Sequence, residues 1–382
     1  MTDWKKIRSD FPITKKMTYF QSAAMSPLPV PVFKAVQREY RKLLNQGDIH
    51  WHKDIQKFRR LCADLAELIH TQGENVAFVP NTSSAMSLLA ASFQNQIQKP
   101  FNIVSMEDEF PASTLGYEYQ GVDMRYVQPE EARYPVGSIL KMTDQNTLAV
   151  VTSHVQYATG FRQDLKALGQ ELKKKGILFI VNATQSFPFF PIDVKAMNID
   201  VLTASVHKWG FTGHIGTMFY TSSSFRRKYP PAWAGWMSVM PGKDDFIHTA
   251  KNAPFRLHDS AERYIVGTYN LQPLLAFQAA MDYLKAIGFQ NIRNHVMELT
   301  DYLIIGLKRI KVEIISPVAS KKERSAIISF SIGKEKNRLC IKNLARAKIS
   351  VGERAGNIRA SVNIFNNFED IDRLLEVLKN FC

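Results

Sequence analysis

Short apolar runs alternate with segments of helical periodicity through the first two-thirds of the chain. Apolar runs of about four to eight residues indicate buried strands, and apolar residues spaced three and four positions apart indicate helices with one buried face. These patterns predict strands at 75–80, 101–106, 124–129, 147–155, 177–182, 201–206 and 215–222. They predict helices at 54–70, 83–94 and 164–176. Such an alternation predicts an α/β fold with a mostly parallel, seven-stranded sheet covered by helices on both faces.

The pattern changes after about residue 270, where longer helical segments replace the alternation. Helices are predicted at 271–288, 292–310 and 369–381, and a strand is predicted at 325–332. This mixture predicts a smaller α+β unit that follows the large one. We therefore expect an N-terminal segment (1–20), a large domain (21–270) and a small C-terminal domain (271–382).

Polar side chains end the strand predicted at 177–182. The apolar run Ile177–Val181 leads directly into Asn182, and Gln185 follows three positions later. A short apolar run that stops abruptly at polar groups is typical of a buried strand that delivers side chains to a site.

Two other stretches offer candidate chemistry. In "TASVHKWGF" (203–211), Lys208 follows a strand, and partial desolvation there would lower the pKa of its amine and make it a nucleophile for Schiff-base formation. In "VPNTSSAMSLL" (79–89), the first N–H groups and hydroxyls of a helix would cradle a phosphate. Taken alone, each stretch favours a simpler explanation: a strand-end lysine that extends into solvent, and an ordinary helix cap.

The composition is that of an ordinary globular protein, with 382 residues of which 45% are hydrophobic and 22% charged. Cys62, Cys340 and Cys382 lie far apart, which argues against a disulfide scaffold and a zinc cluster, so no metal site is expected. The N-terminus lacks the apolar core of a signal peptide, and no run approaches the ~18 apolar residues of a membrane span. We expect a cytoplasmic protein without a membrane partner.

The net charge of +14 raises the hypothesis of nucleic-acid binding. The basic residues are scattered along the chain and are not interleaved with aromatic residues, so a basic solvated surface is the favoured explanation. A positive potential would also favour an anionic cofactor or substrate.

Taken in order, these features resemble the class V aminotransferase family of pyridoxal-phosphate (PLP) enzymes, which includes cysteine desulfurases, kynureninases and isopenicillin-epimerase-like proteins. The order is the polar helix start, an aromatic residue in "MEDEFPAS", then "SHVQYATG", the strand end at Asn182, and "SVHKW". The resemblance runs from "DFPITKKMTYFQSAAMSPLP" (10–29) to "IRASVNIFNNFEDIDRLLEVL" (358–378). It implies the PLP-dependent transferase fold of the aspartate-aminotransferase type, and a homodimer.

The resemblance also implies which residues hold the cofactor. Lys208 would form the Schiff base with PLP. Ser205 and His207 would contact the cofactor phosphate, and Thr82 and Ser83 would supply the helix N-terminus for that phosphate.

Further residues follow from the same resemblance. Phe110 would stack on the pyridine ring, Gln185 would bind the phenolic oxygen, and Asn182 would lie at the ring nitrogen. Thr268, in "VGTYN", would reach the phosphate in the neighbouring subunit of a dimer. Arg359 would grip the substrate carboxylate, for which a guanidinium offers a planar two-bond fork.

The chain departs from the family pattern at two places. Desulfurases of the family need a nucleophilic cysteine on a loop shortly before the carboxylate-binding arginine, and none lies between "AKISVG" and Arg359. We therefore expect that the chain is not a cysteine desulfurase that uses a catalytic cysteine. In addition, Asn182 stands where the family has an aspartate that pairs with the ring nitrogen. An amide cannot offer the charge-assisted bond, which is about twice as strong as a neutral one, so the cofactor would be a weaker electron sink.

Three hypotheses remain open at this point. The favoured one is a PLP enzyme that acts on an amino acid, most similar to an aminotransferase, with transamination, lyase and epimerase chemistry unresolved. The second is a PLP-binding protein with weak or lost catalysis, for which Asn182 is the support. The third is a basic nucleic-acid-binding protein. Candidates for contact with the substrate side chain are His50, Trp51, Arg162 and Arg354.

Overall fold

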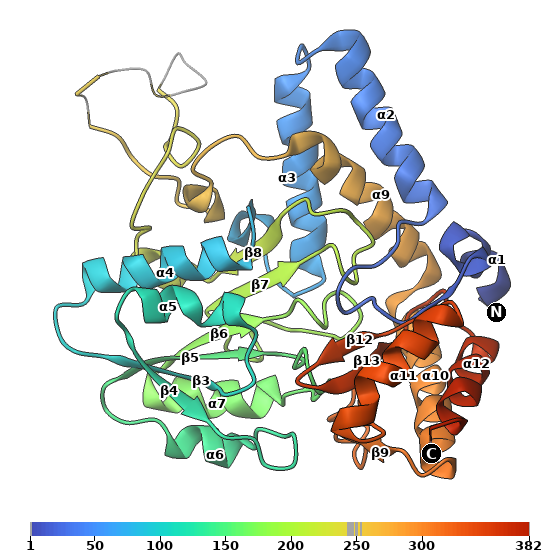
Figure 1. Cartoon of the computed structure of the whole chain (residues 1–382). Coiled ribbons are helices and arrows are strands. Elements are labelled where there is room, and N and C mark those ends of the chain that lie inside the picture. Colours follow the sequence, from blue (N-terminus) through green and yellow to red (C-terminus); the bar gives the residue numbers. More distant parts are fainter. Residues whose placement is uncertain (1, 243–247, 249–250, 253, 382) are drawn as a thin grey trace.

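A seven-stranded sheet forms the centre of the larger unit of the computed structural model, which describes residues 2–242, 248, 251–252 and 254–381 (Figure 1). The strand order is β2-β8-β7-β6-β5-β3-β4. β8 is antiparallel to both of its neighbours, and the other pairs are parallel. The strands are β2 (Val76–Val79), β3 (Asn102–Met106), β4 (Asp123–Val127), β5 (Thr147–Ser153), β6 (Leu178–Asn182), β7 (Val201–Ser205) and β8 (Thr217–Thr221). The predicted mostly parallel sheet of an α/β fold is confirmed.

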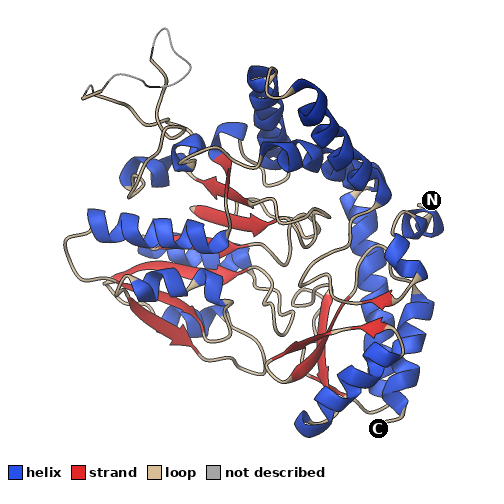
Figure 2. Cartoon of the chain, turned by 45° about the horizontal axis from the view of Figure 1, so that its top comes forward, coloured by secondary structure: helices blue, strands red, loops and turns tan. Residues whose placement is uncertain are grey.

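Helices lie on both sides of the sheet (Figure 2), and the residues of the central strands β5, β6 and β7 are almost all buried. Burial on both faces explains why these strands appear in the sequence as continuous apolar runs. In β6, Ile180 packs into the hydrophobic cluster beneath α4 (Thr82–Gln96) and α5 (Leu115–Tyr119). Phe179 and Val181 point to the opposite face and pack with leucines of α7 (Leu165–Lys175). Each fully buried aliphatic side chain contributes roughly 1.5–3 kcal/mol, so this double burial fixes the strand in the core.

Three helices pack together beside the sheet: α2 (Val30–Gln46), α3 (Trp51–Glu67) and α9 (Leu271–Ile287). The sequence pattern predicted 54–70 for the second of these, but the helix ends before His70, which takes a positive φ of 58° and cannot continue it. The remaining helices of the larger unit are α5, α6 (Val136–Lys141), α8 (Ser223–Lys228) and the 3-10 helices at Gly73–Asn75, Pro111–Ser113 and Ala261–Tyr264.

The smaller unit has its own hydrophobic cluster around a four-stranded antiparallel sheet of order β12-β13-β10-β9. Its strands are β9 (Glu313–Ile314), β10 (Ile327–Ser331), β12 (Gly352–Arg354) and β13 (Asn357–Ser361). They are covered by α10 (Phe289–Arg309), α11 (Lys334–Arg346) and α12 (Phe368–Lys379). The side chains of α9 share the core of the larger unit, and the division of the chain at residue 270 stays a prediction.

The N-terminal segment packs against the smaller unit through strand pairing and hydrogen bonds. β1 (Thr18–Tyr19) pairs in parallel with β11 (Ile349–Ser350). From α1 (Trp4–Ser9), Arg8 donates two hydrogen bonds to the carboxylate of Asp370 on α12, at 2.7 and 3.0 Å. This segment also contains a 3-10 helix at Pro12–Lys15. Across the described residues, no helix is both long enough and apolar enough to span a membrane.

Candidate active site

A cavity of about 340 Å³ opens where β5, β6 and β7 end, the edge at which parallel sheets bind ligands. Both units contribute to its wall. It is lined by Ala23, Ala24, Asn81, Thr82, Ser83, Phe110, Ala112, Ser153, Tyr157, Asn182, Thr184, Gln185, Ser205, His207, Lys208, Arg354 and Arg359. All the predicted cofactor and carboxylate residues except Thr268 therefore surround one cavity.

One end of the cavity is rich in hydroxyl groups and helix N–H groups. The Asn81 side chain caps α4 by accepting a hydrogen bond from the Ser84 N–H at 2.8 Å. The Oγ1 of Thr82 lies 3.0 Å from the Oγ of Ser205, at the end of β7. The first N–H groups of a helix have no partner inside the helix, and its positive dipole end attracts anions. This end of the cavity is therefore suited to a phosphate.

Lys208 lies in the cavity with an unusually acidic amine. Burial lowers the pKa of Lys208 to about 7, and the positive charges of Arg359 and Arg354 lower it further in the same direction. Its Nζ lies 5.6 Å from the centroid of the Phe110 ring. An amine with this pKa is about half neutral at pH 7, and the neutral amine is the form that attacks a carbonyl carbon.

His207 lies beside Lys208 and is also held neutral. Burial lowers the pKa of His207 to about 4, with smaller contributions from Lys208 and His214, whose ring centroid lies 4.4 Å away. A neutral imidazole adds no further repulsion against the lysine amine. It retains one N–H donor that can bind an acceptor on a ligand.

Strand register aligns three polar residues, of which Ser153 and Asn182 line the cavity. Ser153 on β5, Asn182 on β6 and Thr203 on β7 are direct neighbours across the sheet. Asn182 accepts a hydrogen bond from the Thr184 N–H at 3.0 Å and donates one from Nδ2 to the Oγ of Ser113, also at 3.0 Å. The amide orientation is therefore set by partners on both sides.

Gln185 is held in place at both ends of its amide. Its Nε2 donates to the carbonyl of Ala23 at 2.9 Å, and its Oε1 accepts from the indole N–H of Trp209 at 3.1 Å. Trp209 itself is buried beside Phe189. Trp209, the last residue of "SVHKW", thus positions the Gln185 side chain in the cavity. The sequence did not predict this role.

Arg359, on β13 of the smaller unit, is 1% exposed, and part of its guanidinium has no partner. Nη1 donates to the carbonyl of Tyr157 at 2.7 Å, whereas Nε and Nη2 are buried with no hydrogen-bond partner among the described residues. Burial, followed by the charge of Arg354, lowers the pKa of Arg359 to about 9. A buried charge without partners is costly, and a ligand carboxylate would satisfy it.

A buried carboxylate lies directly behind the cavity wall, at Glu109, and was not predicted as a site residue. It is 6% exposed and accepts hydrogen bonds from the N–H groups of Phe110 and Ser153 and from the Ser153 hydroxyl. Two acidic neighbours in the sequence, at 107 and 108, suggest a solvated stretch, so the pattern gives no indication that this third residue points inward.

The other candidate residues lie at separate places. Thr268 is exposed and does not line the cavity of its own chain, so its predicted reach into a neighbouring subunit stays untested. Of the candidates for the substrate side chain, Arg354 lines the Lys208 cavity, whereas His50 and Arg162 line other surface pockets.

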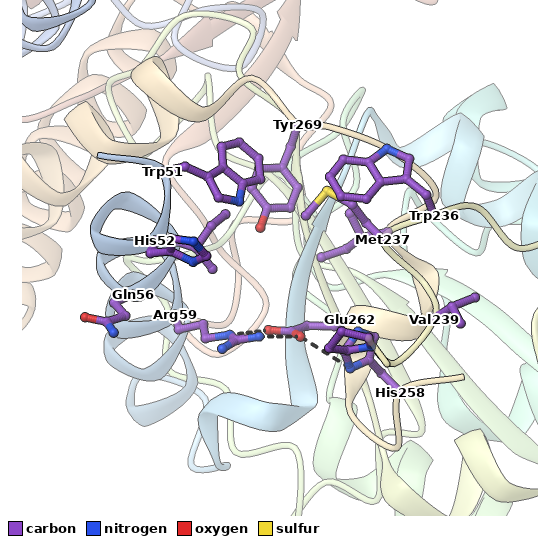
Figure 3. A pocket seen from close by; sticks show the side chains of 13 residues that line it. Trp51, His52, Gln56, Arg59, Trp236, Met237, Val239, His258, Glu262 and Tyr269 are labelled. Atoms are coloured by element: carbon purple, nitrogen blue, oxygen red, sulfur yellow. Dashed lines mark hydrogen bonds and ion pairs between the residues drawn. The ribbon is translucent and has the colours of Figure 1, made fainter. Parts of the chain in front are cut away.

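Trp51 opens on a second cavity, of about 250 Å³ (Figure 3). Its ring lies 6.4 Å from that of Trp236, and Tyr269 lies beside both in the same wall. At the other side, the Glu262 carboxylate bridges Arg59 and His258. The charges of this second cavity are thus already paired within the chain.

Comparison with known proteins places the whole chain in one family. The family model "Aminotransferase class-V" matches residues 18–374, and the chain belongs to this family. A probable cysteine desulfurase from Methanothermobacter thermautotrophicus is 26% identical over 98% of this chain and 97% of its own length. The uncharacterized aminotransferase YcbU from Bacillus subtilis is 28% identical over 76% of each chain.

Solved structures share the fold. An apo cysteine desulfurase from Thermococcus onnurineus superposes with a TM-score of 0.89 at 21% identity, covering 98% of this chain and 97% of the other. The cystine C–S lyase C-DES, solved with its product cysteine persulfide, gives a TM-score of 0.84 at 19% identity, covering 97% and 99%. The expected PLP-dependent transferase fold and family are confirmed.

One expectation from the sequence is wrong. The absence of a cysteine before Arg359 led us to exclude cysteine desulfurases, yet the relatives that match along nearly the full length are named cysteine desulfurases. The inference failed because it rested on the position of one loop residue, whereas the family match rests on the whole chain. Within the described residues, Cys62 and Cys340 are buried, and neither lines the Lys208 cavity.

The residues present fit the cofactor of the family, PLP. A phosphate-type helix start, a lysine amine near pKa 7, an aromatic face and an unsatisfied guanidinium surround the same cavity. The predicted PLP cofactor is confirmed with the family, whereas the role of each residue remains a prediction.

Proposed function

We propose that the chain is a PLP-dependent enzyme that acts on a small α-amino acid and removes its sulfur, with a cysteine-type compound as substrate. The observation that carries the amino-acid part is the placement of Lys208 and the incompletely paired Arg359 around one cavity. The sulfur part is supported by the names of full-length relatives, which are cysteine desulfurases.

In this proposal the cofactor phosphate binds at the start of α4. Thr82 and Ser83 offer the N–H groups of the first helical turn, and Ser205 adds a hydroxyl. His207 donates an N–H from its neutral ring. Phe110 covers one face of the cofactor, and Gln185 donates the second hydrogen of its Nε2 to the phenolic oxygen.

The substrate is oriented by its carboxylate. Arg359 binds it with Nε and Nη2, the two nitrogens that lack a partner in the chain. This salt bridge fixes the amino group and the Cα–H bond relative to Lys208. Bound PLP supplies the electron sink that makes the Cα–H bond acidic. The neutral Lys208 amine then accepts the Cα proton and later returns one, which is efficient because its pKa is near the working pH.

A homodimer completes the proposal. Thr268 is exposed on the loop that carries Ile265 and Tyr269, two lining residues of the second cavity, and in a dimer its hydroxyl would bind the phosphate held by the neighbouring chain. A cytoplasmic location also belongs to the proposal.

Transamination is the second candidate reaction, favoured by the similarity to YcbU, which is named an aminotransferase. The same Lys208 and Arg359 serve it, since both reactions begin with proton transfer from Cα. The two differ in the fate of the side chain, so products distinguish them.

The test starts with purified full-length protein loaded with PLP. Borohydride reduction followed by peptide mass spectrometry should place the cofactor on Lys208, and the visible cofactor band should be absent or altered in Lys208→Ala. L-cystine should then yield cysteine persulfide with pyruvate and ammonia. L-cysteine should yield either sulfide with pyruvate and ammonia, or alanine with a persulfide on a thiol added as sulfur acceptor. Production of a keto acid from L-alanine in the presence of a second keto acid, without sulfur release from either sulfur amino acid, would favour transamination. No covalent cofactor at Lys208 would refute the proposal.

A further inference from the structure

Glu109 is a buried acid whose oxygens are surrounded by hydrogen-bond donors. Oε1 accepts from the Phe110 N–H at 2.9 Å and from the Ser153 hydroxyl at 2.5 Å, and Oε2 accepts from the Ser153 N–H at 2.7 Å. Gln156 adds a longer contact from Nε2, at 3.4 Å. Both oxygens therefore accept a backbone N–H, which is the arrangement that suits a carboxylate anion.

Glu109 has no counterion among the residues that the structure describes. No lysine, arginine or histidine side chain within the described part of the chain forms an ion pair with Glu109. Burial raises the pKa of Glu109 above its ordinary value, and the hydrogen bonds from Ser153, Phe110 and Gln156 offset only part of this rise. An acid kept in such surroundings without a counterion is expensive to maintain, so a structural role alone explains it poorly.

A serine connects this carboxylate to Asn182. The Oγ of Ser113 lies 3.0 Å from Nδ2 of Asn182, which donates to it, and 3.4 Å from Oε1 of Glu109, to which it donates. The hydroxyl has one proton, and the carboxylate needs it, so the serine must accept from the asparagine amide. The acid and the Thr184 N–H thus favour the same orientation of the Asn182 amide, with Nδ2 toward Ser113.

A second route joins the same residues through the sheet. Ser153 binds Glu109 with both its N–H and its hydroxyl, and it is the direct neighbour of Asn182 in the β5–β6 register. Glu109 is therefore connected to the end of β6 by two routes, one through Ser153 on the neighbouring strand and one through Ser113. Its position is fixed relative to the residue that the family resemblance places at the cofactor ring nitrogen.

We propose that Glu109 supplies, through Ser113, the negative charge that Asn182 lacks, and thereby holds a proton on the ring nitrogen of bound PLP. Glu109 is a positioning residue in this role, because it acts through Asn182 and does not line the cavity. The inference rests on the proposed function, since it requires PLP at Lys208.

The physical reason is that a buried charge acts over more than one hydrogen bond. Screening by water is weak behind the cavity wall, and a negative charge within several ångströms favours the protonated form of a nearby base. Loss of that charge should reduce the protonation constant of the ring nitrogen about tenfold, which corresponds to a change of one in its pKa.

The experiment uses the full-length protein reconstituted with PLP that carries ¹⁵N in the ring. The ¹⁵N chemical shift at neutral pH reports directly whether the ring nitrogen carries a proton, independently of turnover. The wild type should show the protonated shift, and Glu109→Gln should move it toward the unprotonated value. Glu107→Gln is the matched control, because the side chain of this exposed glutamate, two residues away, accepts a hydrogen bond from Gln128 and forms none with Glu109, Ser113 or Asn182 among the described residues.

Two further variants complete the experiment. Ser113→Ala removes the connecting hydroxyl and should shift the resonance in the same direction by a smaller amount, and it decides the question if Glu109→Gln does not fold. Asn182→Asp in the Glu109→Gln background should restore the protonated shift, because the charge then lies at the family position.

Three outcomes overturn the inference: an unprotonated ring nitrogen in the wild type, an unchanged shift in Glu109→Gln, or, where that variant does not fold, an unchanged shift in Ser113→Ala. If the wild type takes up no PLP at Lys208, the proposed function fails first, and the inference fails with it. Uptake of PLP with an unchanged shift leaves the proposed function intact and removes only the role of Glu109.

Discussion

The amine of Lys208 and the ring of Phe110 face each other across the cavity, 5.6 Å from Nζ to the ring centroid. They come from distant places, the turn after β7 and the turn before the 3-10 helix at Pro111–Ser113. Phe110 is 41% exposed although it is a large apolar side chain, and it contacts Tyr157 edge-on at 5.2 Å. A flat ring bound to Lys208 would cover this exposed face.

The first prediction concerns the exposed face of the Phe110 ring. Phe110→Ala should weaken PLP binding about tenfold, because stacked aromatic rings contribute about 0.5–1.5 kcal/mol beyond the area they bury. Phe110→Tyr should bind PLP as the wild type does. The dissociation constant is measured by cofactor fluorescence, with Tyr119→Ala as the control, since Tyr119 is 90% exposed. Equal affinity in Phe110→Ala and the wild type would remove the ring from the cofactor site.

A second prediction concerns the pH dependence of Lys208. Because its pKa is lowered from 10.5 to about 7, the amine of the PLP-free protein becomes neutral as the pH rises through about 7. The rate at which it captures an aldehyde should therefore rise through pH 7 and level off above it. The charges of Arg359 and Arg354 contribute to the lowering, so Arg354→Gln should move the midpoint to higher pH. The exposed Arg346→Gln is the control, and a midpoint near 10.5 in the wild type contradicts the prediction.

The same shift affects stability. In the unfolded chain the lysine is protonated up to about pH 10.4, so between pH 7 and that value the unfolded state binds more protons. The free energy of unfolding of the PLP-free wild type should therefore increase with pH in this window relative to Lys208→Met. Thermal unfolding of both proteins at several pH values measures the difference, which should shrink as the pH approaches the upper limit.

Much of the fold could be predicted from local patterns. Strands such as β6 and β7 are short apolar runs whose both faces are buried, and every strand of the larger sheet lies within or beside its predicted range. β6 begins one residue after the predicted start, at Leu178, and ends at Asn182 as expected. The resemblance to a family supplied what periodicity cannot, namely that Arg359 and Lys208 meet across about 150 positions.

The buried acid behind the site could not be predicted. Glu109 is polar, follows two other acidic residues, and belongs to no periodic pattern, so local sequence indicates a solvated loop. It is buried only because Ser153, from a strand more than forty positions later, and Ser113 provide donors. Hydrogen bonds between residues far apart in the sequence produce no local sequence pattern, so they could not be predicted. The exclusion of desulfurases failed for a related reason, because it relied on one loop position and the family match relies on the whole chain.

A third prediction concerns Arg359. Arg359→Met should raise the KM for the amino-acid substrate roughly 30- to 150-fold, because a charged hydrogen bond is worth about 2–3 kcal/mol. Arg359→Lys should recover only part of this, since an ammonium cannot form the planar two-bond contact. Steady-state kinetics measure the effect.

The same variant gives a stability result. Removal of a buried guanidinium with two unpaired nitrogens should leave the substrate-free protein as stable as the wild type or more stable. A large loss of thermal stability in Arg359→Met would show that the arginine serves the fold and not the substrate.

A fourth prediction tests the dimer. Lys208→Ala and Thr268→Glu should each be inactive alone, the second because a negative charge would repel the phosphate of the neighbouring site. After co-refolding, mixed dimers contain one site with an intact Lys208 and an intact Thr268 from the other chain. About a quarter of wild-type activity should therefore return, since roughly half of random dimers are mixed and each has one working site. No recovery of activity would place Thr268 outside the neighbouring site.

The last prediction concerns Asn182→Asp. If Asn182 alone set the ring-nitrogen pKa, restoring a carboxylate could raise it by about two, equivalent to about 3 kcal/mol and up to a hundredfold in the rate of Cα proton exchange. With Glu109 already supplying charge two hydrogen bonds away, the gain should be much smaller in the wild-type background than in Glu109→Gln.

Two buried carboxylates this close would also repel each other, so Asn182→Asp should lower the stability of the PLP-free protein, and less so when Glu109 is neutral. Exchange of the substrate Cα–H for deuterium, followed by NMR in all four members of the double-mutant cycle, measures the coupling. Additive effects would mean that the two positions act on the ring independently, and only a gain that depends on the other residue supports a shared charge.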